Sequence, residues 1–166
     1  GRPPGWSTTR SATRSGRSAS GSTASWTGWS ALLRVHAALV PQLDRELQAA
    51  CGLPLTWYDV LLELNAAPGR RLSMGELGAV AVVSRSRVSR VVDQLTADGL
   101  VTREANPDDR RSAYATITEA GRARLRAAAP VYLGGIERHF TAHLAAAEAR
   151  TVATALGKVI AELDRS

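Results

Sequence analysis

The sequence predicts a mostly α-helical fold of the α+β class, with about six helices and a wing of two or three short strands. The stretch that predicts it runs from Ser84 to Ile117. It begins with an amphipathic helical pattern, continues with Gly99 as a helix stop, and ends with two extended runs around a turn-forming Asn-Pro-Asp segment. This order of parts is typical of a winged helix-turn-helix.

The first part of this stretch is a helix with two different faces. Val88, Val91, Val92 and Leu95 recur at i, i+3, i+4 and i+7, so they share one apolar face. The remaining positions of the first turns carry serines and arginines, namely Ser84, Arg85, Ser86, Arg87, Ser89 and Arg90. Arginine can donate two hydrogen bonds to guanine O6 and N7, and serine can reach a base edge or a phosphate. The pattern therefore predicts a DNA-contacting face, with an ordinary solvated arginine face as the alternative.

Two residues of this helix have expected roles of their own. Ser84 is the expected N-cap, with the free amides of the first turn facing outward, where a phosphate can bind them. Arg90 is the expected base-reading residue. Asp93 lies three residues further on and is expected to hold the Arg90 guanidinium through an intrahelical pair.

The second part of the stretch predicts a hairpin with a basic tip. Extended runs at 100–104 and 113–117 flank a loop at 105–112. The loop carries Asp109, Arg110 and Arg111, and an arginine at such a tip suits the negative potential of the minor groove. Asp109 is expected to hold the Arg111 guanidinium through a charge-assisted pair. The alternative is a solvated hairpin turn.

Several motifs together carry a family resemblance. Helix and hairpin are followed by the pattern Ile117-Thr118-x-x-Gly121, and upstream stand the segments 55–64, LTWYDVLLEL, and 72–77, LSMGEL. In this order and spacing, over about residues 30–163, the chain resembles the MarR family of bacterial transcription regulators. The resemblance implies an obligate homodimer with intertwined terminal helices, in which two winged domains bind double-stranded DNA at a near-palindromic operator. It also implies repression that a small phenolic or anionic ligand, or an oxidant, relieves.

The chain divides into four segments on this interpretation. Residues 1–25 are rich in Ser, Gly, Thr and Arg, and are expected to be a disordered arm or an extension translated from a misassigned start. Residues 26–54 are expected to form an N-terminal dimerisation helix. The winged DNA-binding domain is expected at 55–117 and the C-terminal dimerisation helices at 118–166.

Capping residues predict where the helices begin. Thr56 is the expected cap of the second helix, and Ser73 with Glu76 has the spacing of a capping box for a short third helix. Thr118 is the expected cap of a long helix that reaches about Ala145, and a final helix follows.

Composition narrows the class of protein. A chain of 166 residues with 45% hydrophobic content suits one domain with a buried core, and a formal charge of +6 favours a polyanionic partner such as nucleic acid. One cysteine excludes an internal disulfide and fits a reducing cytoplasm, and the absence of an apolar run of about 18 residues argues against a membrane span. No nucleophile elbow, phosphate loop or HExxH motif occurs, so neither catalysis nor a cofactor is expected. A ligand-insensitive architectural or protein-contacting winged-helix protein is the alternative function.

Three features are candidates for a sensor. Trp29, His36, Trp57 and Tyr58 would line a cleft for a small aromatic or anionic ligand, against the alternative of aromatic core packing.

The histidines and the cysteine are weaker candidates. His139 and His143 are spaced i, i+4 and, with His36, could contribute to a zinc site, although a solvated or interfacial pair is favoured. Cys51 lies at an apparent helix C-terminal end, whereas reactive thiols lie at helix N-termini or beside cations, so an inert cysteine is expected.

Overall fold

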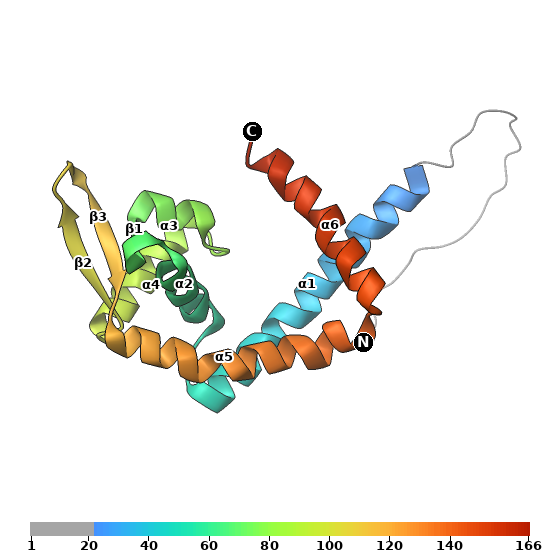
Figure 1. Cartoon of the computed structure of the whole chain (residues 1–166), viewed down its shortest axis with the longest axis horizontal. Helices are drawn as coiled ribbons and strands as arrows, with labels where there is room; N and C mark the ends of the chain where they lie inside the picture. The colour runs from blue at the N-terminus through green and yellow to red at the C-terminus, as the bar shows by residue number, and fades with distance from the viewer. Residues whose placement is uncertain (1–21) are drawn as a thin grey trace, which may run out of the picture. The chain divides into compact units, whose positions relative to one another are not determined.

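The computed structural model describes residues 22–166, so positions 1–21 of the predicted arm at 1–25 lie outside the described residues, whereas positions 22–25 are the first residues of a helix. The chain divides into two compact units, residues 1–37 and residues 38–166. The helices are α1 (Ser22–Cys51), α2 (Leu55–Ala66), α3 (Met74–Val80), α4 (Arg85–Ala97), α5 (Glu119–His139) and α6 (Ala146–Leu163) (Figure 1). The strands are β1 (Arg71–Ser73), β2 (Val101–Asn106) and β3 (Asp109–Ile117), and the 3₁₀ turns are η1 (Pro68–Arg70) and η2 (Thr141–His143). Six helices with a three-stranded wing confirm the predicted fold class.

The sheet is antiparallel, with strand order β1-β3-β2. In the hairpin, Val101 pairs with Ile117, and pairing continues to Asn106 opposite Asp109. The predicted loop at 105–112 was therefore too long, since only Pro107 and Asp108 form the turn. The reason is local: the Asn106 side chain accepts the Asp108 backbone N–H at 2.9 Å and donates to Ser112 Oγ at 3.0 Å, which closes the turn early.

One hydrophobic core joins α2, α4, α5 and the sheet. The predicted apolar face of α4 is buried, with Val88, Val92 and Leu95 at 1% exposure or less and Val91 at 6%. Gly99 has a φ of 72°, the left-handed conformation expected of a residue that stops a helix. Its position lets Leu100 turn back into the core, and β2 begins at the next residue, Val101.

Two predicted caps are confirmed and one is wrong. Ser73 and Glu76 form a capping box, and Thr118 Oγ1 accepts the Gly121 N–H at 3.0 Å. Helix α2, however, begins at Leu55, one residue before the predicted cap Thr56. The reason is a cap from another helix. Asp44 Oδ1 of α1 accepts the Leu55 backbone N–H at 2.8 Å, so α2 needs no cap from its own side chains at this position.

Helix α5 is shorter than predicted. It ends at His139, whereas the sequence suggested a helix reaching about Ala145. Phe140 leaves helical geometry, and the Thr141 hydroxyl bonds to the Glu137 carboxylate. A threonine whose hydroxyl bonds locally competes with helix continuation, and η2 follows.

No helix among residues 22–166 is long and apolar enough to cross a membrane.

Candidate DNA interface

The polar face of α4 is exposed along the predicted contact residues. Ser84 takes the N-cap position with extended backbone, and no side chain in residues 22–166 caps the helix start. Its hydroxyl instead lies 3.2 Å from the Ser86 hydroxyl. The first-turn amides therefore remain available to an anion. Five further side chains on this face are exposed, namely Arg85, Ser86, Arg87, Ser89 and Arg90.

Helix α3 and the turn after it hold the start of α4 in place. Arg85 packs its aliphatic stem over Gly78, where a Cβ atom would lie 3.2 Å from Arg85 Cγ. In the turn, Asp59 Oδ2 of α2 accepts the Val82 backbone N–H at 2.9 Å. Burial raises the pKa of Asp59, because a carboxylate loses hydration there, and the Val82 N–H partly offsets this. Burial likewise raises the pKa of Glu63, with Asp59 as a second cause.

The structure corrects the partner predicted for Asp93. Its Oδ1 lies 3.1 Å from Nη2 of Arg103 in β2, and Arg90 is not the partner. Arg103 Nη2 also lies 3.3 Å from the Ser89 hydroxyl and 3.5 Å from the Ser89 carbonyl oxygen. Arg103 thus joins α4 to strand β2 of the wing, and Ser89 has a protein contact where only a DNA contact was expected.

Sequence reasoning missed Arg103, although a signal for it exists. Side chains alternate along a strand, so Arg103 shares a face with Val101. Val101 is buried in the core that also contains Val92 of α4. A charged residue on that face, just beyond the core, lies where it can reach the polar edge of α4.

The wing arrangement also differs from the prediction. Asp109 and Arg111 stand at the start of β3 rather than in a loop. The Asp109 carboxylate accepts the backbone N–H of Arg111 at 2.9 Å, so the predicted contact with the guanidinium is replaced by a backbone contact. The reason is local, because a short aspartate side chain readily accepts the backbone N–H two residues further along the chain. The Arg111 side chain is exposed. Arg110 lies beside it in β3, and its side chain is not described.

Comparison with known proteins identifies the family. The model of the MarR family matches residues 52–112. The chain is 36% identical over 100 residues to the HTH-type transcriptional repressor Rv2887 of Mycobacterium tuberculosis, covering 60% of this chain and 70% of the relative. The chain belongs to the MarR family.

Other relatives of this MarR-family regulator agree with that assignment. The HTH-type transcriptional repressor YetL of Bacillus subtilis is 31% identical over 88 residues, and the match spans 53% of each chain, about half the relative's length. Two solved Streptomyces coelicolor regulators are each 30% identical. Sco3205, solved in complex with DNA, has a TM-score of 0.76 over 85% of this chain and 88% of its own. AbsC has a TM-score of 0.77 over 87% and 97%.

The aromatic residues of this MarR-family chain are divided between the two units. Tyr58 is 3% exposed, and its ring centroid lies 4.7 Å from that of Tyr132 in α5, so it packs in the core. Burial raises the pKa of both phenols. Trp57 is half-buried, and its indole N–H donates to Gln94 Oε1 of α4 at 3.0 Å. Trp29 and His36 belong to the other unit, so the cleft of four residues stays a prediction.

The predicted histidine pair does not share a helix in this regulator. Helix α5 ends at His139, and His143 lies in η2. His139 instead hydrogen-bonds Glu46 of α1, which also accepts from Gln42 and Arg138. These contacts, with the Gln42 hydrogen bond as the largest cause, lower the pKa of Glu46 to about 2. Among the described residues, no group of three His, Cys, Asp or Glu side chains could hold a metal ion.

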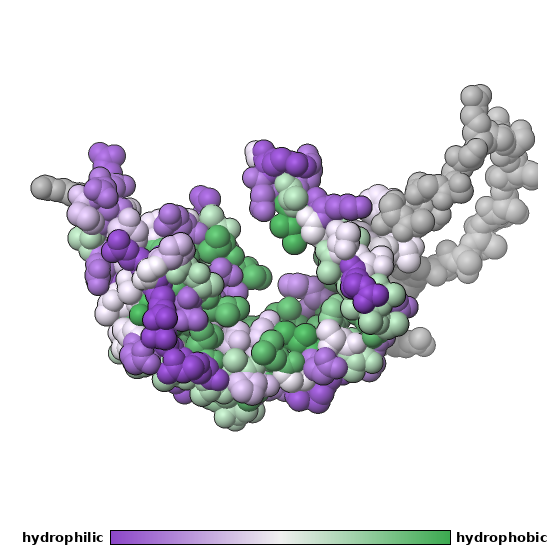
Figure 2. Space-filling model, viewed as in Figure 1, coloured by the Kyte–Doolittle hydropathy of each residue, from purple (hydrophilic) through white to green (hydrophobic). Residues whose placement is uncertain are grey.

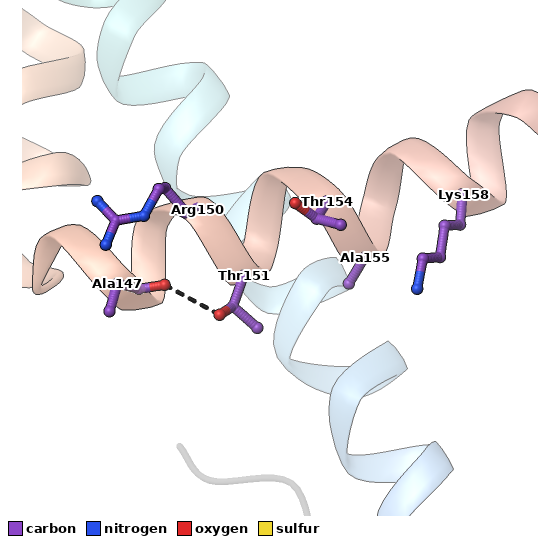
Figure 3. A pocket seen from close by; sticks show the side chains of 6 residues that line it. All are labelled: Ala147, Arg150, Thr151, Thr154, Ala155 and Lys158. Carbon is purple, nitrogen blue, oxygen red and sulfur yellow. Dashed lines mark hydrogen bonds between the residues drawn. The ribbon is translucent and has the colours of Figure 1, made fainter.

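Two remaining features add no ligand site to this regulator. Cys51 is a free, half-buried thiol at the end of α1. A shallow depression lies along one face of α6, lined by Ala147, Arg150, Thr151, Thr154, Ala155 and Lys158 (Figure 3). Thr151 donates to the Ala147 carbonyl oxygen at 2.9 Å, so its hydroxyl is satisfied within the helix (Figure 3). The lining consists of two cations, two threonines and two alanines, and it includes no aromatic or large apolar side chain that would pack against an aromatic molecule.

Proposed function

We propose that this MarR-family regulator binds a near-palindromic DNA operator as a homodimer, represses transcription there, and releases the DNA when a small aromatic or anionic ligand binds. The observation that carries the proposal is the exposed row of arginines and serines on α4, whose opposite face is fixed in the core. A rigid helix with such a face suits direct reading of base edges.

The docking that fits these residues places the start of α4 in the major groove. Ser84 and the first-turn amides would meet a phosphate, while Arg90 would donate to guanine. The wing would reach the adjacent minor groove with Arg110 or Arg111. Arg103 of β2 contacts both Ser89 and Asp93 of α4, so it would keep helix and wing at a fixed spacing.

Exposed apolar residues on the terminal helices support the homodimer. On α6, Val159, Ile160 and Leu163 are 56%, 57% and 69% exposed, and hydrophobic surface is visible near the C-terminal end of this helix (Figure 2). The Ser22–Ala37 part of α1 carries a second exposed set, which comprises Trp26, Trp29, Leu32, Leu33 and Val35. A second copy of the chain would cover such faces. Two recognition helices would then address sites about 10 base pairs apart.

Trp57 supports a route for ligand release. Its indole bonds Gln94, which lies on α4 itself. A ligand that displaced this contact would act directly on the recognition helix. Trp29, His36 and Tyr58 remain the other proposed ligand-binding residues, and Tyr58 would contribute only an edge, since its ring is buried.

Binding of the full chain to DNA tests the proposal. Fluorescence anisotropy at physiological salt compares the duplex upstream of its own gene with a scrambled duplex. We expect a preference of about a thousandfold or more. Equal, salt-sensitive binding to both would favour an architectural protein. Binding to neither would favour a protein-contacting winged helix.

A further inference from the structure

Val82 is an unusual residue of the turn between α3 and α4. Its side chain is 82% exposed, the highest value among the exposed large hydrophobic side chains of the described residues. It stands two residues before Ser84, the N-cap of α4. After the half-buried Val83, the residues Ser84, Arg85 and Ser86 are all polar and exposed. Val82 is therefore an exposed apolar group directly beside the polar surface at the start of α4.

The backbone around Val82 is fixed rather than free. The Val82 N–H donates to Asp59 Oδ2 at 2.9 Å, and the Ala81 N–H donates to the Leu77 carbonyl oxygen at 2.9 Å. Val83 is half-buried against the core. With the residues on both sides packed and its own amide held from α2, the Val82 side chain points outward from a defined position.

The hydrogen bond from Val82 to Asp59 that anchors this turn requires a carboxylate to lose part of its hydration. Asp59 is partly desolvated, and burial raises the pKa of its carboxyl group. A solvent-exposed carboxylate would avoid this penalty. The fold thus uses a partly buried acceptor to hold one backbone amide, which fixes where Val82 lies relative to the start of α4.

The chemistry of the major groove suggests what such a group contacts. Base edges there present hydrogen-bond donors and acceptors, and one apolar group, the C5-methyl of thymine. With the start of α4 docked in the major groove as proposed above, Val82 would face the same groove. We infer that Val82 contacts the C5-methyl group of a thymine in the operator and so contributes to sequence specificity. This inference rests on the proposed DNA-binding function.

Replacement of thymine by deoxyuridine tests the contact, because it removes only the methyl group. Each symmetry-related pair of thymines in the operator is replaced in turn, and affinity is measured by anisotropy. For the wild-type protein we expect one pair whose replacement weakens binding about fifteenfold, since loss of one buried methyl costs about fourfold in each of the two half-sites. Val82→Ala should bind the thymine and deoxyuridine forms of that operator equally.

Two control variants keep the test specific. Val82→Thr retains one methyl in nearly the same shape and should retain part of the sensitivity. Val80→Ala makes the same truncation at a neighbouring valine, 48% exposed, and should retain all of it.

Identical deoxyuridine profiles for the wild type and Val82→Ala would overturn the inference, as would loss of sensitivity in Val80→Ala. Failure of the proposed function has a different signature, because the wild type itself would then show no preference for the thymine operator over scrambled DNA.

Discussion

Helices α4 and α6 are both amphipathic, but they satisfy their apolar faces in different ways. Val88, Val92 and Leu95 of α4 are buried within the chain, whereas Val159, Ile160 and Leu163 of α6 are more than half exposed. No residue of α6 is buried. The same sequence pattern thus stabilises the fold of the chain in one helix and offers a surface in the other.

The two helices therefore contribute to different properties, α4 to the stability of the folded chain and α6 to its association with another surface. Burial of the α4 face lowers the free energy of the folded chain itself. The α6 face can contribute only when another surface covers it. Substitutions in the two helices should therefore change different measured quantities.

The largest expected effect is a loss of stability in α4. Leu95→Ala removes a fully buried side chain and should lower the free energy of unfolding by about 2–5 kcal/mol. The matched variant Ile160→Ala, in α6, should change the unfolding of the dilute protein much less. Urea denaturation at low protein concentration measures both. Equal losses would contradict the division between the two helices.

The second effect concerns association. Ile160→Asp places a charge on the exposed apolar face, and an unpaired charge is costly to bury in an interface. We expect self-association to weaken about a hundredfold or more, with the far-UV circular dichroism of the folded chain unchanged. Sedimentation velocity over a range of concentrations measures it. Thr151→Asp adds the same single charge in the depression of Figure 3, on the opposite face of α6, and is the matched control. Unchanged association in Ile160→Asp would exclude this face from the interface.

The third effect separates base reading from phosphate contact. Arg90→Ala should cost about 1–3 kcal/mol on the operator and relax its sequence preference. Arg111→Ala should weaken binding more evenly across sequences and reduce the salt dependence. Anisotropy on operator and random duplexes at several salt concentrations measures both. An equal loss for Arg90→Ala on operator and random DNA would remove its base-reading role.

Sequence pattern alone predicted the parts of the fold that depend on local order. The face of α4 follows from spacing, the Gly99 stop from backbone freedom, and the capping box at Ser73 from the residue types at the helix start. Each of these is decided within a few residues of the chain. Local order also predicted that a final helix follows α5.

Contacts between distant segments could not be predicted in the same way. Asp93 had an arginine within one helical turn, and only the packing of β2 against α4 brings Arg103 close enough to replace it. The start of α2 depends on Asp44, eleven residues before Leu55 and on another helix. Such partners are chosen by tertiary structure, which no single window of sequence contains.

The fourth effect is a small coupling between helix and wing. Arg103 and Asp93 form an exposed pair, so a double-mutant cycle with Arg103→Met and Asp93→Asn should give a coupling of about 0.2–1 kcal/mol in stability. The effect on DNA binding should be larger in Arg103→Met than in Asp93→Asn, because Arg103 also holds Ser89. Denaturation and anisotropy of the four proteins measure the cycle. A coupling near zero in both assays would show that helix and wing are positioned without this pair.

The smallest effect is a pH dependence with opposite signs at two carboxyl groups. Glu46 has its pKa lowered from an ordinary 4.5 to about 2, so its contribution to stability is present above pH 4.5 and is lost as the pH falls toward 2. Glu46→Gln should remove that acid-sensitive contribution.

Asp59 has its pKa raised above 3.8 by burial, so the folded state favours the protonated form. Asp59→Asn keeps an oxygen that can accept the Val82 N–H and removes the charge.

The two variants should therefore diverge from the wild type in opposite directions at neutral pH. Asp59→Asn should melt at or above the wild-type temperature, with the difference shrinking as acid protonates the wild-type carboxyl group. Glu46→Gln should melt below it, and this difference should shrink only at lower pH, since Glu46 holds its charge to about pH 2. Thermal denaturation from pH 2 to pH 7 measures both curves. If Asp59→Asn were instead strongly destabilised at pH 7, the carboxylate charge itself would hold the turn, and the α3–α4 segment would depend on α2 electrostatically rather than through one hydrogen bond.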